Sequence, residues 1–322
     1  MQTLYIATDE GLTIGQYQNS QLDVKRQTLT DTLVTSVIVS EETILAGTKR
    51  GIYRSFDCGH TWQPANNGLN TPYVRWLATH PDNAQLKFAG TEPAALFASP
   101  DDGATWREAR EVATLRDEFG WWLPYSPEAG CVRGFAFAGS RAYAAVEVGA
   151  ALRSDDGGTT WDLAEGSEGH PVFREPESGI VHPDVHSVEV HPSSADLVFA
   201  ATAGGLYRSE DGGKQWRRLF ECYCRALWLD PEDARHIIFG SADGPSGRNG
   251  QIWETSNAGR VWHTNADGLE TPWSDALVER FVQSGKNLFG VLSNGQLIVT
   301  HLYEHKWRTV WTDKPGVNAV AI

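Results

Sequence analysis

The chain has 322 residues, of which 41% are hydrophobic, and it contains 13 Trp, 32 Gly and 15 Pro. This composition is typical of a globular protein rich in strands and turns and argues against a disordered chain. The 27 Lys and Arg against 41 Asp and Glu give a formal net charge of −14, which repels phosphate backbones, so we expect no nucleic-acid partner.

The first residues, MQTLYIATDEGL, alternate as in a strand and lack the basic and apolar regions of a signal peptide. No apolar run reaches the roughly 20 residues that a membrane-spanning helix needs, so no membrane contact is expected. The cysteines lack the CxxC spacing of zinc or redox motifs and are expected to be reduced thiols: Cys58, Cys131, Cys222 and Cys224. We therefore expect a cytoplasmic protein, and a monomer.

One eight-residue phrase recurs along the chain. Clear copies are SFDCGHTW, SPDDGATW, SDDGGTTW and SEDGGKQW, which begin at Ser55, Ser99, Ser154 and Ser209, and weaker copies begin at Thr255 and Thr300. The starts lie 44, 55, 55, 46 and 45 residues apart, so the repeating unit has about 45 residues, with insertions before the third and fourth copies. This spacing is the period of a propeller blade.

Each unit has the same order of predicted strands. In the fourth unit an alternating strand, VHSVEVHP, precedes an apolar strand, LVFAAT, then GGLYRS, and a last strand starts at the tryptophan. At the chain ends, GVNAVAI matches a first strand and TLYIATDEGLTIGQYQ a second and third. We predict an all-β fold: one seven-bladed propeller domain over residues 1–322 with four-stranded antiparallel blades, closed by a last blade that combines about 315–322 with 1–30.

The phrase from Ser99 to Trp106 resembles the Asp-box, or BNR repeat, of sialidases, sortilin, xyloglucanases and the photosystem II assembly-factor propellers. The resemblance covers the whole chain and implies the propeller fold, but the repeat occurs in proteins of unrelated function. We call the four clear copies the Asp-box turns.

In an Asp-box turn the carboxylate is expected to accept backbone amides, glycine to adopt a positive φ, and tryptophan to pack between blades. The residues with these structural roles are Asp57, Asp101, Asp156, Asp211, Trp62, Trp106, Trp161 and Trp216. Four carboxylates spread around a ring cannot meet in one catalytic site, so we assign them no chemistry.

Aligning the first strands of the units gives one equivalent position per blade near the mouth of the central channel. These positions are Thr35, Arg75, Arg133, His186, Arg225, Glu279 and Asn318. Guanidinium groups bind carboxylate, phosphate or sulfate through paired hydrogen bonds. The three arginines and the histidine are therefore expected to bind an anionic ligand.

Two alternatives remain at these positions. Glu279, Glu147 or Asp184 could neutralise the cations instead of a ligand. The alignment is weakest at Glu279, where a slip of one residue would bring Val278 or Arg280 inwards.

The two insertions are expected to lie as loops over the same mouth. The first, RDEFGWWLPYSPEAG, contains Trp121 and Trp122 beside acidic residues, and the second, EGHPVFREPESGIVHPDVH, adds His182. Aromatic rings next to carboxylates suit a sugar, so these three residues are candidate ligand contacts. Alternatively, the adjacent tryptophans plug the channel.

Glu147 ends a second strand where it reaches the mouth. Paired with Asp184 or Glu118, it marks where a glycosidase would place its two carboxylates. The structural alternative is a salt bridge from Glu147 to Arg133 or Arg75.

His182, Asp184 and His186 alternate along the chain and would share one strand face, where they could act as three ligands of a metal ion. Pro183 interrupts that strand, so we expect no metal and no cofactor.

Two functions follow. The first is a binding or scaffold propeller whose mouth takes an anionic small molecule, a carbohydrate or an acidic peptide of a protein partner. The second is a glycoside hydrolase; sialidases use an arginine triad that the three arginines could imitate, although sialidases have six blades. Two carboxylates within about 10 Å, one of them desolvated, favour hydrolysis, whereas carboxylates all tied to arginines favour binding.

Overall fold

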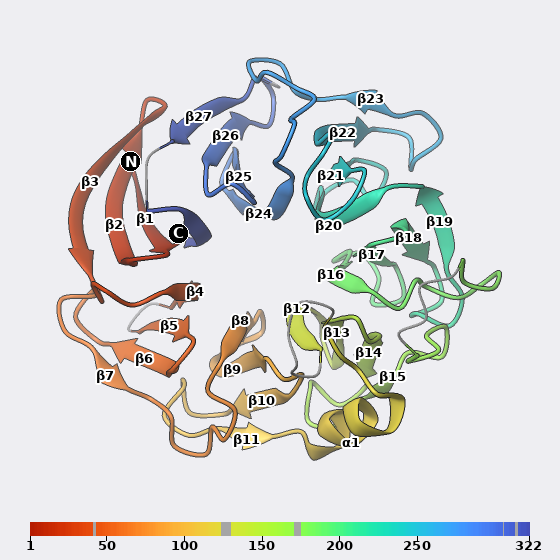
Figure 1. Ribbon diagram of the computed structural model, residues 1–322, viewed down its shortest axis with the longest axis horizontal. Coiled ribbons are helices and arrows are strands. Elements are labelled where there is room, and N and C mark those ends of the chain that lie inside the picture. Colours follow the sequence, from red (N-terminus) through yellow and green to blue (C-terminus); the bar gives the residue numbers. More distant parts are fainter. Residues whose placement is uncertain (41–42, 124–129, 171–174, 305, 313–314) are drawn as a thin grey trace.

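The computed structural model describes residues 1–40, 43–123, 130–170, 175–304, 306–312 and 315–322. Seven four-stranded antiparallel sheets stand around one axis as the blades of a propeller, each with its first strand innermost (Figure 1). The predicted all-β, seven-bladed fold is confirmed. No helix in the described part of the chain is long and apolar enough to cross a membrane.

The blades are numbered from the one that follows the N-terminal strands. Blade 1 contains β4 (Val34–Val39), β5 (Ile44–Thr48), β6 (Gly51–Ser55) and β7 (Gln63–Pro64). Blade 2 contains β8 (Val74–His80), β9 (Asn83–Thr91), β10 (Leu96–Ser99) and β11 (Arg107–Glu108). Blade 3 contains β12 (Cys131–Ala138), β13 (Arg141–Glu147), β14 (Ala151–Ser154) and β15 (Asp162–Leu163).

The second half of the ring repeats this order. Blade 4 contains β16 (Val185–Val190), β17 (Val198–Thr202), β18 (Gly205–Ser209) and β19 (Arg217–Phe220). Blade 5 contains β20 (Tyr223–Leu229), β21 (Ile237–Ala242), β22 (Gln251–Thr255) and β23 (His263–Thr264). Blade 6 contains β24 (Val278–Ser284), β25 (Asn287–Leu292), β26 (Leu297–His301) and β27 (Arg308–Trp311).

Blade 7 joins the two ends of the chain, as predicted. It contains β28 (Val317–Ala321), β1 (Gln2–Thr8), β2 (Gly11–Gln18) and β3 (Gln21–Thr28). Strand β28 pairs with β1 in antiparallel register, with Ala321 opposite Tyr5 and Ala319 opposite Ala7. This pairing completes the four strands of blade 7 and closes the ring between its first and last parts.

The Asp-box turns hold themselves together through local hydrogen bonds. Asp57 Oδ1 accepts the backbone amides of His60 (3.0 Å) and Thr61 (2.8 Å), and the Ser55 hydroxyl accepts the amide of Gly59 (2.8 Å), which has φ 76°. Bonds from Thr61 lower the pKa of Asp57 below its ordinary value. The corresponding serine and carboxylate bonds recur around Asp101, Asp156 and Asp211.

The tryptophans of these turns fill the space between neighbouring blades. Trp106, Trp161 and Trp216 are only 3–4% exposed. Trp106 packs with Leu45 of blade 1 and Phe97 of blade 2 and donates to the Ala65 carbonyl (2.9 Å). Trp62, at the first turn, is partly buried.

The first insertion, residues 116–130, starts inside a helix, which corrects the expectation of a loop over the mouth for its first residues; residues 124–129 lie outside the described part of the chain. Helix α1 (Arg110–Phe119) lies at the outer rim of the ring (Figure 1). Val112, Leu115 and Phe119 pack against the core cluster of blades 2 and 3. Their helical spacing is the signal that a search for strands overlooked.

The innermost strand of every blade has a register shift at the same place. The residue skipped by the pairing is Thr35, Arg75, Arg133, His186, Glu279 and Asn318 in six blades, and Arg225 together with Ala226 in blade 5. A β-bulge redirects the side chain of the extra residue. The positions aligned from the sequence are therefore the bulge residues of the seven inner strands.

Candidate functional site

A cavity of about 390 Å³, here called the central cavity, lies at the axis of the ring. Its lining consists of Leu33, Thr35, Lys49, Tyr73, Arg75, Arg133, Glu147, Arg225, Glu279, Arg280, Val291, Leu292, Ser293, Val317 and Asn318. Six of the seven bulge residues are in this set. Five cationic side chains and two carboxylates face the cavity, in a protein whose net charge is −14.

One side of the central cavity neutralises itself. Glu279 lies between two arginines: Arg133 Nη2 donates to Glu279 Oε2 at 2.8 Å, and Arg225 Nη1 forms an ion pair with Oε1. Arg133 also donates to Glu147 Oε2 at 3.1 Å. The Tyr223 hydroxyl accepts from Arg225 Nε and Nη2 at 3.0 and 2.9 Å. These contacts match the alternative in which carboxylates neutralise the arginines.

The carboxylates of this network remain ionised. Burial opposes the charge of Glu147, but Arg133 and the neighbouring cations hold its pKa below the ordinary value. Burial likewise opposes the charge of Glu279, and Arg225 and Arg133 lower its pKa. Neither group therefore holds a proton for general acid catalysis near neutral pH.

Arg280 lies against the opposite wall of the central cavity. Its Nη2 donates to the carbonyls of Thr35 (3.1 Å) and Arg75 (3.3 Å), on two strands across the axis from β24. Its guanidinium carbon lies 3.6 Å from the centre of the Trp76 ring. Within the described residues no carboxylate lies at ion-pair distance from Arg280. Burial and the charge of Arg133 lower the pKa of Arg280 to about 9.

From the sequence, Arg280 was expected to face the channel only if the strand slipped by one residue and turned Glu279 away. The bulge explains why this expectation was wrong. In a regular strand, successive side chains point to opposite faces. The bulge at Glu279 lets both Glu279 and Arg280 line the central cavity. The break of the two-residue period at this bulge was not evident from the sequence.

Two further cations complete this wall. Arg75 Nη1 donates to Glu92 Oε2 at 2.8 Å and to the Tyr73 hydroxyl at 3.0 Å. Lys49 Nζ lies 5.3 Å from the centre of the Tyr73 ring, and no described carboxylate pairs with it. Lys49 directly follows β5 of blade 1, and Tyr73 directly precedes β8 of blade 2. Both were missed because they lie just outside the strands that were aligned.

A second hollow, here called the side groove, adjoins the central cavity and has a volume of about 850 Å³. Its lining comes from blades 3 to 5 and consists of Glu147, Val148, Glu175, His182, Asp184, Ala203, Gly204, Arg218, Phe220, Glu221, Cys222, Tyr223, Arg225, Ser241, Ala242, Asp243, Gly244, Pro245, Asn249, Gln251 and Trp253. Five carboxylates and two arginines face it. Its charge is thus opposite to that of the central cavity, with which it shares Glu147 and Arg225.

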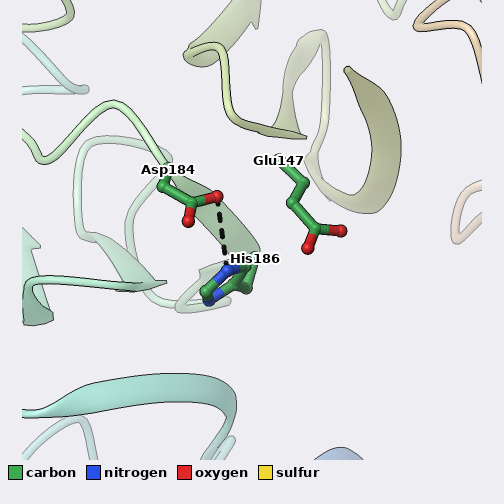
Figure 2. Close-up of side chains that lie close together, drawn as sticks. All are labelled: Glu147, Asp184 and His186. Carbon is green, nitrogen blue, oxygen red and sulfur yellow. Dashed lines mark ion pairs between the residues drawn. The ribbon is translucent and has the colours of Figure 1, made fainter. Parts of the chain in front are cut away.

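At the boundary of the two hollows, Glu147 from blade 3 meets Asp184 and His186 from blade 4 (Figure 2). One ligand atom from each lies within 4.8 Å of the other two, and all three residues are buried. His186 Nε2 lies 3.3 Å from Asp184 Oδ1, and His186 Nδ1 lies 2.8 Å from the Cys224 carbonyl oxygen. This contact places His186 behind the mouth, outside the central-cavity lining.

His182 lines the side groove but stays outside this cluster. Its Nδ1 accepts the backbone amide of Asp184 at 3.1 Å, and burial lowers its pKa. Of the three residues that alternate along the chain, only Asp184 and His186 therefore lie together, and the third member of the cluster is Glu147 of the neighbouring blade. The sequence did not indicate the contact with Glu147, because alternation along one strand says nothing about side chains of the neighbouring blade.

Trp121 and Trp122 of the first insertion line neither the central cavity nor the side groove, and Tyr125 lies outside the described residues. Trp121 is 1% exposed and donates to the Gly169 carbonyl at 2.6 Å, so its assignment as a ligand contact is corrected to a core role. Trp122 is 48% exposed and lines neither hollow. Glu118 is exposed on α1 at the outer rim of the ring (Figure 1). Its assignment as a catalytic partner of Glu147 is therefore wrong.

No family model matches the chain, and no curated protein matches it by sequence. Several solved structures resemble it. An ancestral GH74 enzyme matches with a TM-score of 0.62 and 16% identity over 100% of this chain, which spans only 40% of that enzyme. YCF48 bound to D1 peptide matches with a TM-score of 0.61 and 14% identity, covering 96% of this chain and 88% of that one.

YCF48 from Cyanidioschyzon merolae matches with a TM-score of 0.63 and 13% identity, covering 93% of this chain and 90% of that one. At identities this low, the similarity is one of fold and does not transfer activity. The chain is a seven-bladed β-propeller, and the similar structures single out no specific family.

Proposed function

We propose that this propeller binds an anionic small molecule or the acidic end of a peptide in the central cavity. The observation that carries the proposal is Arg280, a guanidinium held across the axis by two carbonyls and Trp76 without a described carboxylate partner. An anion that reaches Arg280 would supply the missing counter-charge and gain charge-assisted hydrogen bonds. Lys49 and Arg75 line the same cavity.

The wall of Arg133, Arg225 and Glu279 supports this function in another way. Its ion pairs fix both guanidinium groups at the cavity without leaving either charge unbalanced. A carboxylate, phosphate or sulfate of the ligand would meet a preorganised surface and lose little entropy on binding. YCF48 is known with a bound D1 peptide, which makes a peptide carboxylate a reasonable source of the anion.

Glycoside hydrolysis is the second candidate, because Glu147 and Asp184 approach as closely as the paired carboxylates of glycosidases. Their charge state opposes this function. Burial raises the pKa of each group, but Arg133 beside Glu147 and His186 beside Asp184 lower both below the ordinary values. A general acid requires the opposite shift.

We also propose that the protein acts in the cytoplasm as a monomer. The support is chemical: all four cysteines are free thiols, as suits a reducing compartment. Size-exclusion chromatography with light scattering tests the monomer.

The proposed ligand class is tested by a thermal-shift screen of the full chain with sialic acid, sugar acids, phosphates, sulfate and short acidic peptides. A binding anion should raise Tm, and calorimetry should then give its affinity. Arg280→Gln should weaken that affinity by about 10- to 100-fold, the value of hydrogen bonds to a charged group. The matched control is Arg235→Gln, which removes an exposed arginine paired with Asp233 outside both hollows.

The proposal is wrong if no anion shifts Tm, or if a bound anion keeps its full affinity in Arg280→Gln. Chromogenic glycosides are assayed with the same proteins. Turnover that disappears in Glu147→Gln but persists in Arg280→Gln would favour the hydrolase.

A further inference from the structure

A second site lies where the side groove ends, at the three side chains of Figure 2. We propose that Glu147, Asp184 and His186 bind a divalent transition-metal ion of the Zn²⁺ or Mn²⁺ class. This site is separate from the anion site, and its test does not depend on whether an anion binds.

The ligand types and spacing fit such an ion. Two carboxylates and one imidazole supply three ligand atoms, each within 4.8 Å of the others. Ligand atoms bonded to tetrahedral Zn²⁺ at about 2.0–2.2 Å lie roughly 3.3–3.6 Å apart, so binding requires the side chains to close by up to about 1.5 Å. Imidazole favours a transition metal over Mg²⁺ or Ca²⁺, which prefer oxygen ligands alone.

The orientation of His186 is the strongest argument for the site. Its Nδ1 faces the Cys224 carbonyl oxygen at 2.8 Å, and a carbonyl can only accept, so Nδ1 carries the hydrogen. In the neutral ring, Nε2 then directs a lone pair towards Asp184 Oδ1, 3.3 Å away. Two lone pairs at this distance repel unless a cation or a proton lies between them. Without a metal, the Tyr223 hydroxyl, also 3.3 Å from Nε2, can donate its hydrogen to the ring, and a bound ion would displace this contact.

A backbone carbonyl on the far nitrogen is also the usual support of a metal-bound histidine. It fixes the tautomer and holds the ring in position. The amide of Val148 donates to Asp184 Oδ1 at 2.9 Å and fixes the second ligand in the same way. Both ligands are thus oriented from blades on either side of the cluster.

The charges around the cluster are compatible with a divalent ion. Glu147 and Asp184 together balance its charge when His186 is neutral. Arg133, which pairs with Glu147, keeps its stronger contact with Glu279 at 2.8 Å. The repulsion from Arg133 and Arg225 lowers the affinity but leaves the nearest charges balanced.

The side groove provides a route to the cluster. Glu147 and Asp184 both line it, so an ion can reach them from solvent and keep water molecules as further ligands. Glu175, Glu221 and Asp243 line the same groove and attract cations towards its buried end.

The experiment uses the full-length protein stripped with a chelator and titrated with Zn²⁺ and with Mn²⁺ by calorimetry. We expect one equivalent to bind. Loss of a residue that only supports a metal ligand typically weakens metal binding by about 10- to 100-fold. Asp184→Asn and His186→Gln each remove a ligand and should weaken binding by more than this. His182→Gln is the matched control, because this histidine lines the same groove but is turned to its own backbone, and its affinity should equal that of the wild type.

A measurement on the wild type guards against variants that fail to fold. Pulsed EPR of bound Mn²⁺ should show coupling to one imidazole nitrogen. The proposal is overturned if neither metal binds, if bound Mn²⁺ shows no nitrogen coupling, or if His182→Gln loses affinity while His186→Gln keeps it.

Discussion

The central cavity and the side groove share Glu147 and Arg225 but have opposite charge. Among their described lining residues, cations outnumber carboxylates by five to two in the first, and carboxylates outnumber arginines by five to two in the second. The net charge of the chain therefore says little about either hollow. What separates them is a wall of ion pairs, which would let the proposed anion site and the proposed metal site lie side by side.

The wall depends most on Glu279, whose removal should have the largest effect. Glu279→Gln leaves Arg133 and Arg225 without their shared carboxylate, and we expect the free energy of unfolding in urea to fall by about 3–5 kcal/mol. Sulfate should restore part of this loss, because an anion can take the place of the carboxylate.

The control for this variant is Glu210→Gln. Glu210 pairs with Arg208 through a carboxylate that is 68% exposed, and its loss should cost less than about 1 kcal/mol. Equal losses in the two variants would show that the bridge between the two arginines does not stabilise the fold.

A carboxylate without a described cation sharpens the contrast with the paired groups of the wall. Glu189 lies on β16, and burial raises its pKa from 4.5 to about 8. The folded protein keeps this proton while the unfolded chain loses it above pH 4.5, so stability falls between pH 4.5 and about 8. Glu189→Gln abolishes this dependence.

We expect Glu189→Gln to be more stable than the wild type by about 1–3 kcal/mol at about pH 8.5, with no such gain at about pH 4. Urea unfolding at the two pH values measures the difference. An equal gain at both would mean that packing, rather than ionisation of Glu189, sets the effect. The ionised state of Glu147 does not depend on this result, because the cations around Glu147, first among them Arg133, lower its pKa.

The fold could be predicted from the sequence because its signals are local. Each Asp-box turn is complete within eight residues, from the serine to the tryptophan, so its bonds need no distant partner. The repeat counts the blades, and the two chain ends supply the strands of the last one. The helix α1 was missed because its apolar stripe is short and stands inside an insertion.

The site was predictable in position, and its pairing was predictable only as an open alternative, in which Glu147 and Glu279 neutralise the arginines. Aligned strands placed one residue per blade at the bulges, since every blade repeats the same local geometry. Two of the contacts join different blades. Arg133 binds Glu279, which lies 146 residues further along the chain, and Glu147 lies beside His186 of the neighbouring blade. Contacts of this kind follow from ring closure and side-chain reach, which no repeat pattern encodes. Whether the aligned arginines bind a ligand stays a prediction.

The smallest expected effect concerns Lys49, the exposed cation at the rim of the central cavity. Lys49→Met should weaken anion binding by no more than about tenfold, because water and salt screen an exposed charge. Lys25→Met on the outer strand β3, where Lys25 pairs with Asp23, should leave the affinity unchanged. At about 1 M salt the effect of Lys49→Met should vanish, whereas that of Arg280→Gln should largely persist because its guanidinium is partly buried against the Trp76 ring. Equal salt sensitivity of the two variants would place the anion at the rim rather than on Arg280.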